Sequence, residues 1–156
     1  MQRGATIELG QMKALVGHEV GISDWMAIPQ SRIDKFADVI DDHQFIHVDP
    51  IAAARTPLGG TIAHGFLTLS LMSQMSYQVV PKIANQTMSI NYGFDKVRFL
   101  APVPAGAEVR GRFTLVSADE RKPGEILLRF AATVEMRGSD KPALAAEWLA
   151  LIAVSA

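Results

Sequence analysis

The chain has 156 residues, of which 49% are hydrophobic and 20% charged, and its 15 Lys and Arg nearly balance 16 Asp and Glu to leave a net charge of −1. This length and composition are typical of one compact domain with its own core, so we expect a single domain over residues 1–156. The absence of Cys excludes disulfides, thiolate zinc sites and a cysteine nucleophile, and the balanced charge, without a block of Lys and Arg, indicates no nucleic-acid partner.

The N-terminal segment carries no apolar core of the length that a signal peptide needs. The longest apolar run, from 143 to 154, is interrupted by Glu147 and is too short for a membrane span. We therefore expect no signal-directed export, no membrane partner and, by default, a cytoplasmic protein.

The first third of the chain predicts three elements. Residues 11–16 are expected to form one helical turn, and the apolar, partly β-branched residues 18–28 are expected to form a strand that ends at Pro29. Ser31, with an acid three residues later, is typical of an N-cap. Because the apolar residues that follow recur at helical spacing on one face, a short amphipathic helix is predicted over 31–41.

The segment from 56 to 81 contains no Asp, Glu, Lys or Arg. From Gly65 to residue 80 its apolar residues are distributed around all sides of a helix, which predicts a helix buried on every face. Such a helix reaches only about 24 Å at about 1.5 Å per residue, and Ser, Thr and Gln interrupt its apolar surface. We expect it inside the protein and not in a bilayer.

The second half of the chain changes from helical spacing to alternation of apolar and polar residues. This period of two predicts long, half-buried antiparallel strands joined by short turns. The predicted strands cover 88–100, 109–116, 126–137 and 144–154. The alternation in the first of them switches faces near Asp95, as a β-bulge requires.

Long antiparallel strands and one charge-free helix have a simple packing solution in the α+β class. A strongly curved antiparallel sheet wraps around the central buried helix, which is the hot-dog fold. A single sheet layer in so small a chain leaves part of the helix or of the sheet edge uncovered. We therefore expect at least a homodimer, or a higher homo-oligomer.

The residues that could carry chemistry gather in two short segments, which together hold three of the four His. Asp42 and His47 are five residues apart in a segment before Pro50, so a folded loop can aim a carboxylate and an imidazole at one water. Gly65 stands where the buried helix begins. The N–H groups of a helix's first turn lack internal partners and can stabilise an oxyanion.

These segments also resemble motifs of a known family. The run D-H-Q-F-I-H-V-D-P at 42–50 resembles the D-x-N-P-x-H-x-D-P signature of the MaoC-like dehydratases, in their (R)-specific enoyl-CoA hydratase branch. His64 to Leu67 resembles the family's H-G-x-L, and N-Y-G-F-D-K-V-R-F at 91–99 resembles a strand of its nodulation-protein-N-like members. Gln44 and Phe45 replace the usual Asn-Pro pair, a variant that also resembles this subgroup and that bears on substrate choice more than on chemistry.

The resemblance implies a hydro-lyase that interconverts trans-2-enoyl-CoA and (3R)-3-hydroxyacyl-CoA without a cofactor, coenzyme A being part of the substrate. It implies that Asp42 and His47 bind the water and that the Gly65 amide polarises the thioester oxygen. The resemblance also suggests four further candidates for substrate binding, namely Gln44, Ser73, Lys96 and Arg98. Ser73 would hydrogen-bond near the thioester, and Lys96 and Arg98 would contact the coenzyme A phosphates.

Plainer interpretations stand beside these. A lone Asp42 would be a turn former, a lone His47 a satisfied buried histidine, and a strand bearing Lys96 and Arg98 a solvated face. A metal site is a further alternative, formed by His43, His47, Asp49 and His64. The helical spacing of His43 and His47 means little in an irregular loop, so we expect no metal. For the whole chain the alternatives are an acyl-CoA thioesterase, whose usual helix carboxylate is absent here, and a non-catalytic acyl-thioester binding module.

Overall fold

The computed structural model describes residues 4–155. Its elements, in chain order, are β1 (Thr6–Ile7), α1 (Leu9–Ala14), β2 (Glu19–Ile22), β3 (Met26–Ala27), α2 (Gln30–Ile40), α3 (Phe45–Val48), α4 (Pro50–Ala54), α5 (Gly65–Val79), β4 (Lys82–Ile83), β5 (Gln86–Phe99), β6 (Glu108–Lys122), β7 (Glu125–Met136) and β8 (Leu144–Val154). None of the described helices is both long enough and apolar enough to cross a bilayer.

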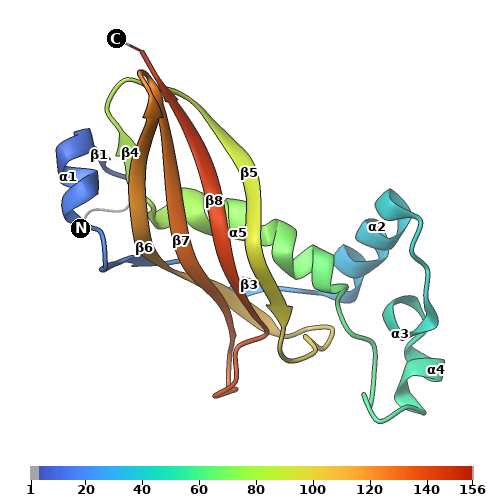
Figure 1. The fold of residues 1–156 in the computed structure, drawn as a ribbon. Helices are drawn as coiled ribbons and strands as arrows, with labels where there is room; N and C mark the ends of the chain where they lie inside the picture. The colour runs from blue at the N-terminus through green and yellow to red at the C-terminus, as the bar shows by residue number, and fades with distance from the viewer. Residues whose placement is uncertain (1–3, 156) are drawn as a thin grey trace.

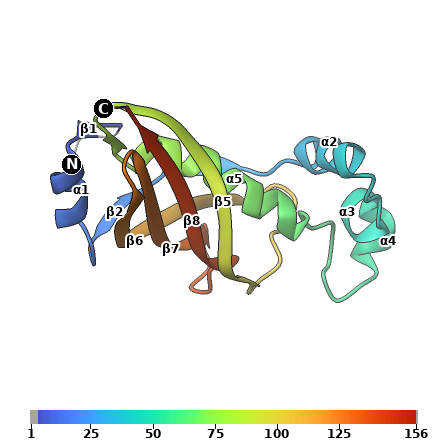
Figure 2. The same cartoon turned by 45° about the horizontal axis from the view of Figure 1, so that its top comes forward.

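The main sheet is antiparallel and curves around α5 (Figures 1 and 2). Its strand order is β2-β6-β7-β8-β5, and the short β3 also pairs with β6. β1 and β4 form a separate parallel pair beside it. This arrangement confirms the predicted α+β hot-dog architecture.

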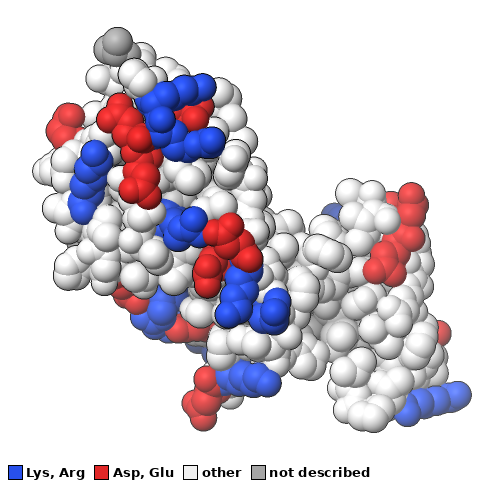
Figure 3. Space-filling model, in the orientation of Figure 1, with Lys and Arg blue, Asp and Glu red and all other residues white. Residues whose placement is uncertain are grey.

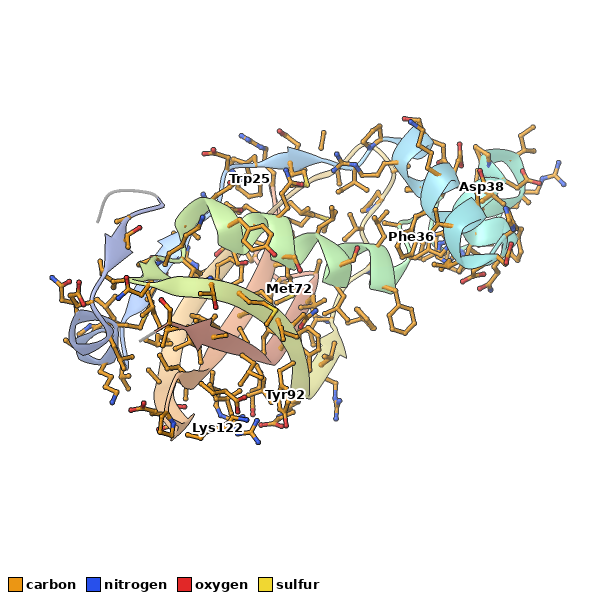
Figure 4. The ribbon with its side chains drawn as sticks, turned by 90° about the horizontal axis from the view of Figure 1, so that it is seen from above. Trp25, Phe36, Asp38, Met72, Tyr92 and Lys122 are labelled. Carbon is orange, nitrogen blue, oxygen red and sulfur yellow. The ribbon has the colours of Figure 1, made fainter. Side chains whose placement is uncertain are left out.

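The core lies between the concave face of the sheet and α5, because the alternating residues of the strands point inward there. Five large side chains of this core expose 2% or less of their surface, namely Phe113, Phe130 and Leu144 of the sheet and Met72 and Met75 of α5. Figure 4 shows Met72 on the side of the helix that faces the strands. Burial of such side chains contributes about 1.5–3 kcal/mol each to folding.

Two glycines let α5 come close to the sheet. A Cβ on Gly111 would lie 3.0 Å from the Met75 Cβ, and a Cβ on Gly21 would lie 2.5 Å from the Val79 Cβ. Real Cβ atoms essentially never approach to 2.5 Å and seldom to 3.0 Å, so the absence of a side chain at both positions lets the helix lie this close to the sheet.

The structure corrects three local predictions. The strand expected over 18–28 is two short strands, β2 and β3. Between them Ser23 stays attached to β6, because its amide donates to the Gly111 carbonyl and its hydroxyl accepts from the Gly111 amide, both at 2.9 Å. The helix α2 begins at Gln30 with Pro29 as its N-cap, so Ser31 is not the cap. The helix α1 spans Leu9–Ala14, two residues earlier than expected.

The helix α5 is not buried on every face, as its sequence suggested. Phe66 and Tyr77 are 66% and 68% exposed, and Ser70 and Gln74 between them are also exposed. The sheet covers one side of the helix and nothing in the described chain covers the other. The predicted bulge near Asp95 is confirmed, because the register of β5 against β8 shifts between Phe94 and Lys96.

Two features of the architecture position the site. The short helices α2, α3 and α4 stand beyond the N-terminal end of α5, apart from the sheet (Figures 1 and 2). β5 is the last strand of the sheet, and most of its residues are exposed.

Candidate active site

The segment that carries Asp42 and His47 is placed by the end of α2. Asp41 caps that helix with a left-handed backbone (φ 57°), which turns the chain back toward α5. Phe36 lies on the side of α2 that faces the start of α5, whereas Asp38 points away from it (Figure 4). The ring centroids of Phe36 and His64 are 5.3 Å apart, so the turn is packed onto the start of α5.

His47 is held on three sides. Its Nδ1 lies 2.7 Å from the Ile62 carbonyl oxygen, and Gln30 Nε2 donates to the His47 carbonyl at 2.7 Å. The His47 ring also stacks on the His64 ring at 3.8 Å. Because a carbonyl only accepts, Nδ1 must donate, and the neutral imidazole keeps Nε2 as a free proton acceptor.

Asp42 lies beside this pair of rings. His64 Nε2 donates to the Asp42 carbonyl oxygen at 3.0 Å and lies 3.9 Å from its Oδ2. The backbone N–H of Gln44 donates to Asp42 Oδ1 at 3.3 Å. One ligand-capable side-chain atom from each of Asp42, His47 and His64 lies within 4.8 Å of the other two, although 22 residues separate Asp42 from His64.

The cluster fits proton transfer better than metal binding. A zinc ligand nitrogen lies about 2 Å from its ion in the plane of the ring, and the planes of His47 and His64 are stacked only 24° from parallel. The other residues considered for a metal are engaged elsewhere. His43 binds Asp38 at 2.9 Å, and Asp49 accepts from the Ile51 and Ala52 amides as the N-cap of α4.

A cavity of about 310 Å³ opens between the start of α5 and the chain that follows β5. His47, Gly65, Phe99 and Leu100 are among the residues that line it. The Leu67 and Thr68 amides bind the His64 carbonyl, whereas the Gly65 amide has no acceptor among the described residues. This amide carries the positive end of a 15-residue helix toward the cavity.

Glycine at position 65 leaves room for a neighbouring ring. A Cβ there would lie 2.9 Å from the Phe99 ring, so this half-exposed ring would have to shift for any other residue. The arrangement places a proton acceptor, His47, and the free Gly65 amide on one cavity, with the Asp42 carboxylate beside His47. Its chemistry is acid–base catalysis next to a stabilised oxyanion.

Comparison with known proteins identifies the family. A model of the MaoC like domain matches residues 11–135, most of the chain. The chain belongs to this family. The MaoC-like domain is 51% identical over 146 residues to nodulation protein N of Rhizobium meliloti (strain 1021), covering 93% of this chain and 91% of that protein. It is 45% identical over 139 residues to 3-hydroxyacyl-thioester dehydratase Z of Mycobacterium tuberculosis (strain H37Rv), covering 89% and 91%.

Solved structures confirm the architecture of the MaoC-like domain. The (R)-hydratase from A. caviae involved in PHA biosynthesis matches with a TM-score of 0.67 and 25% identity, over 83% of this chain and 95% of that one. The monoamine oxidase regulatory protein from Archaeoglobus fulgius matches with a TM-score of 0.80 over all of both chains, and at 21% identity it supports the fold alone. The resemblance drawn from the sequence motifs is therefore confirmed.

The MaoC-like domain does not bring all the sequence candidates to one place. His47 and Gly65 line the cavity and Asp42 lies beside His47, whereas Ser73 lines a different cavity of about 90 Å³ between α5 and the strands. Ser73 is eight residues beyond Gly65, about 12 Å along the helix. Gln44 is exposed and contributes its backbone to the Asp42 turn.

Lys96 and Arg98 lie on the outer face of the sheet, where they line a groove of about 450 Å³. Sequence reasoning missed Gln30, which joins α2 to the backbone of His47 and accepts from the Thr61 hydroxyl. No local pattern marks these two contacts of Gln30, because His47 and Thr61 are 17 and 31 residues away. His64 connects the two segments, because its Nε2 donates to the Asp42 carbonyl oxygen.

Proposed function

We propose that this MaoC-like domain catalyses the reversible (R)-specific hydration of trans-2-enoyl-CoA to (3R)-3-hydroxyacyl-CoA. The single observation that carries the proposal is the placement of Asp42 and His47 within 4.8 Å of each other beside a cavity that the Gly65 helix start also lines. The names of the 45% identical 3-hydroxyacyl-thioester dehydratase and of the (R)-hydratase neighbour support the same reaction class.

The chemistry follows from the charges that develop. The thioester oxygen accepts a hydrogen bond from the Gly65 amide, which stabilises the enolate formed when water adds to Cβ. Asp42 and the free Nε2 of His47 hold that water; one of its protons passes to this pair as its oxygen bonds to Cβ. When the enolate collapses, the pair returns the proton to Cα. Both parts of water thus reach one face of the alkene.

The proposal also covers the cofactor requirement and the cellular location of the reaction. Water and the enoyl thioester are the only reactants, so no cofactor beyond the coenzyme A of the substrate is needed. Coenzyme A thioesters are intracellular metabolites, and this substrate is our ground for a cytoplasmic protein.

The proposal also includes a homodimer formed through β5 and the open side of α5. Met88, Ile90 and Tyr92 of this edge strand are between 43% and 51% exposed, and Tyr77 of α5 is 68% exposed. Tyr77 and Ile90 line the same cavity, so the two exposed surfaces adjoin. An uncovered strand edge next to apolar side chains favours pairing with a second copy.

The test is a series of trans-2-enoyl-CoA substrates of increasing chain length, starting from crotonyl-CoA. Loss of the conjugated enoyl absorbance and formation of the (3R)-alcohol, identified by chiral analysis, are the expected results. Release of free thiol without hydration would instead identify a thioesterase. Tight binding of every substrate without change would identify a binding module, and either result would overturn the proposal.

A further inference from the structure

Gln30, the first residue of α2, joins this helix to two other segments through its side-chain amide. Its Nε2 donates to the His47 carbonyl oxygen in α3 and to Asp34 Oδ1, both at 2.7 Å. Its Oε1 accepts from the hydroxyl of Thr61, in the segment that leads to α5. The three contacts use both amide protons and one lone pair of the oxygen, so the side chain is fully occupied as a donor.

These partners allow only one orientation of the Gln30 amide. The His47 carbonyl and the ionised carboxylate of Asp34 can only accept, so the NH2 group must face them and the oxygen must face the Thr61 hydroxyl. A glutamate of the same length could not donate to either acceptor. It would also add a negative charge to α2, over which acidic side chains already gather (Figure 3). Position 30 is thus matched to a neutral donor.

The backbone of His47 depends on this donor. The helix α3 spans only Phe45–Val48, and the last carbonyls of a helix have no partner within the helix. Among the described residues, Gln30 supplies the donor to the His47 carbonyl. The contact therefore fixes the C-terminal end of this short helix to the start of α2.

Gln30 also supports the contact that sets which nitrogen of the His47 ring is protonated. His47 Nδ1 donates to the Ile62 carbonyl, and Ile62 directly follows Thr61, which binds Gln30. The Ile62 amide donates in turn to the Ile46 carbonyl at 3.0 Å. The two segments therefore share a backbone hydrogen bond, and Gln30 connects them a second time. One connection lets the segments rotate about it, whereas two hold the Ile62 carbonyl in front of Nδ1.

We infer that Gln30 is a positioning residue that fixes the tautomer of His47. Because it holds the Ile62 carbonyl against the Nδ1 proton, it keeps Nε2 unprotonated. The inference rests on the proposed function for its effect on catalysis, since that function requires Nε2 to accept a proton from water. Gln30 lies outside the set of described residues that line the cavity, so it acts through His47 and not on the substrate.

The first test observes the tautomer directly, by heteronuclear NMR of the His47 ring nitrogens at a pH where the ring is neutral. In the wild-type protein Nδ1 should give the shift of a protonated nitrogen and Nε2 that of an unprotonated one. Gln30→Met keeps the length of the side chain and removes all three hydrogen bonds, so the two shifts should move toward each other as the second tautomer becomes populated. The inference is wrong if the wild type has a protonated Nε2, or if Gln30→Met keeps the wild-type shifts.

The second test measures rates on an enoyl-CoA. The kcat of Gln30→Met should fall about 10-fold or more, the range known for hydrogen-bond partners that orient the histidines of metal sites, whereas KM should not change. Gln11→Met is the matched control, because Gln11 accepts from the Glu8 amide at 2.9 Å on α1, at the opposite end of the molecule from α2 (Figure 1). It should keep the wild-type tautomer and kcat. A rise in KM alone, or an equal loss of kcat in the control, would contradict the assignment.

Variants of Thr61 test the same connection if Gln30→Met does not fold. Thr61→Val removes the hydroxyl that binds Gln30 and should shift the tautomer and lower kcat in the same direction, whereas Thr61→Ser keeps a hydroxyl and should behave as wild type. The double variant Gln30→Met/Thr61→Val should lose no more activity than Gln30→Met, because both changes break one connection. Additive losses, or a Thr61→Val protein with the wild-type tautomer, would overturn the connection.

The two measurements also separate this inference from the proposed function. A tautomer that shifts in Gln30→Met, in a protein whose wild type hydrates no thioester, would reject the hydratase and keep the assignment of Gln30. Hydration by the wild type, with an unchanged tautomer and kcat in Gln30→Met, would reject the assignment and keep the hydratase.

Discussion

His47 shows how a single side chain is prepared for chemistry by contacts from distant parts of the chain. The Ile62 carbonyl fixes its protonated nitrogen, Gln30 holds its backbone and the His64 ring supports its face. His47 is 7% exposed and lines the cavity, and His64 is 2% exposed. Because each contact restricts a different motion of the ring, the orientation of Nε2 is set before substrate binds.

At this scale we predict that Asp42→Asn and His47→Gln each lower kcat at least about 100-fold, because each removes a group that moves a proton. Both replacements keep the size of the side chain, so the fold should persist. Steady-state rates on an enoyl-CoA, together with the thermal midpoint from circular dichroism, check the prediction. A variant with a near-normal rate would show that its residue takes no part in the reaction.

Among the elements, α5 depends on the two glycines that admit it to the sheet. Its inward side packs on Phe113 and Phe130, and its outward side carries Phe66 and Tyr77 in solvent. One side of the helix is therefore buried and the other exposed, although apolar residues lie around most of its circumference. This difference between pattern and burial is itself evidence that the open side has a further partner.

At the same scale we predict that Gly21→Ala destabilises the protein by about 1–3 kcal/mol, because the new Cβ would overlap with Val79 at the end of α5. Gly10→Ala is the matched control, since a Cβ there meets nothing within 4 Å and the residue lies in a helix. Urea unfolding of both variants measures the free energy of unfolding. Equal midpoints for the two variants would mean that the helix shifts freely on the sheet.

The pairing of β6 with β7 is reinforced by one acid between two arginines. Arg110 Nε and Arg112 Nε donate to Glu135 at 2.7 and 2.8 Å. Burial alone would raise the pKa of Glu135, but hydrogen bonds from Arg112 and Arg110 outweigh it and hold the pKa below its ordinary value. A carboxyl with a lowered pKa in the folded state stabilises the fold above its unfolded pKa and loses that contribution as the pH falls through the folded pKa.

We therefore predict that Glu135→Gln costs about 1 kcal/mol of stability at neutral pH, the order of a good partly exposed ion pair. The difference between variant and wild type should shrink as the pH falls below the ordinary carboxyl range of about 4. Urea unfolding at several pH values provides the comparison. A difference that is constant across this range would show that the carboxylate charge contributes nothing.

At the scale of the whole molecule, the exposed edge strand β5 and the open side of α5 form one surface, and this surface borders the active-site cavity. Phe66 and Phe99 contact each other at 6.0 Å between ring centroids, and both also line that cavity. A second copy on this surface would cover the apolar side chains and narrow the entrance to the site. Oligomerisation and catalysis are thereby coupled in the proposed function.

We predict that Tyr77→Lys/Ile90→Lys converts a dimer into a monomer, because two charges would be buried unpaired in the interface. Val39→Lys/Ile51→Lys is the matched control, since these residues are 80% and 73% exposed on α2 and α4. Light scattering after size-exclusion chromatography measures the mass of each protein. The proposed interface would be wrong if both double variants kept the wild-type mass, or if the wild type itself were a monomer.

Local sequence by itself determined the long strands, the central helix, the bulge at Asp95 and the motif that carries Asp42 and His47. These features depend on periods of two and 3.6 residues and on neighbours within a few positions. The same reasoning located Gly65 at the helix start, because the loss of charged residues and the His-Gly pair are both local signals.

Only the tertiary structure decided which of these groups meet. It joined His64 to Asp42 across 22 residues and Gln30 to His47 across 17, and it separated Ser73 from both. It also broke the strand expected over 18–28 and left one side of α5 open. The physical reason is that contacts between distant segments depend on how α2, α3 and the sheet pack around α5, and no short-range period encodes that packing.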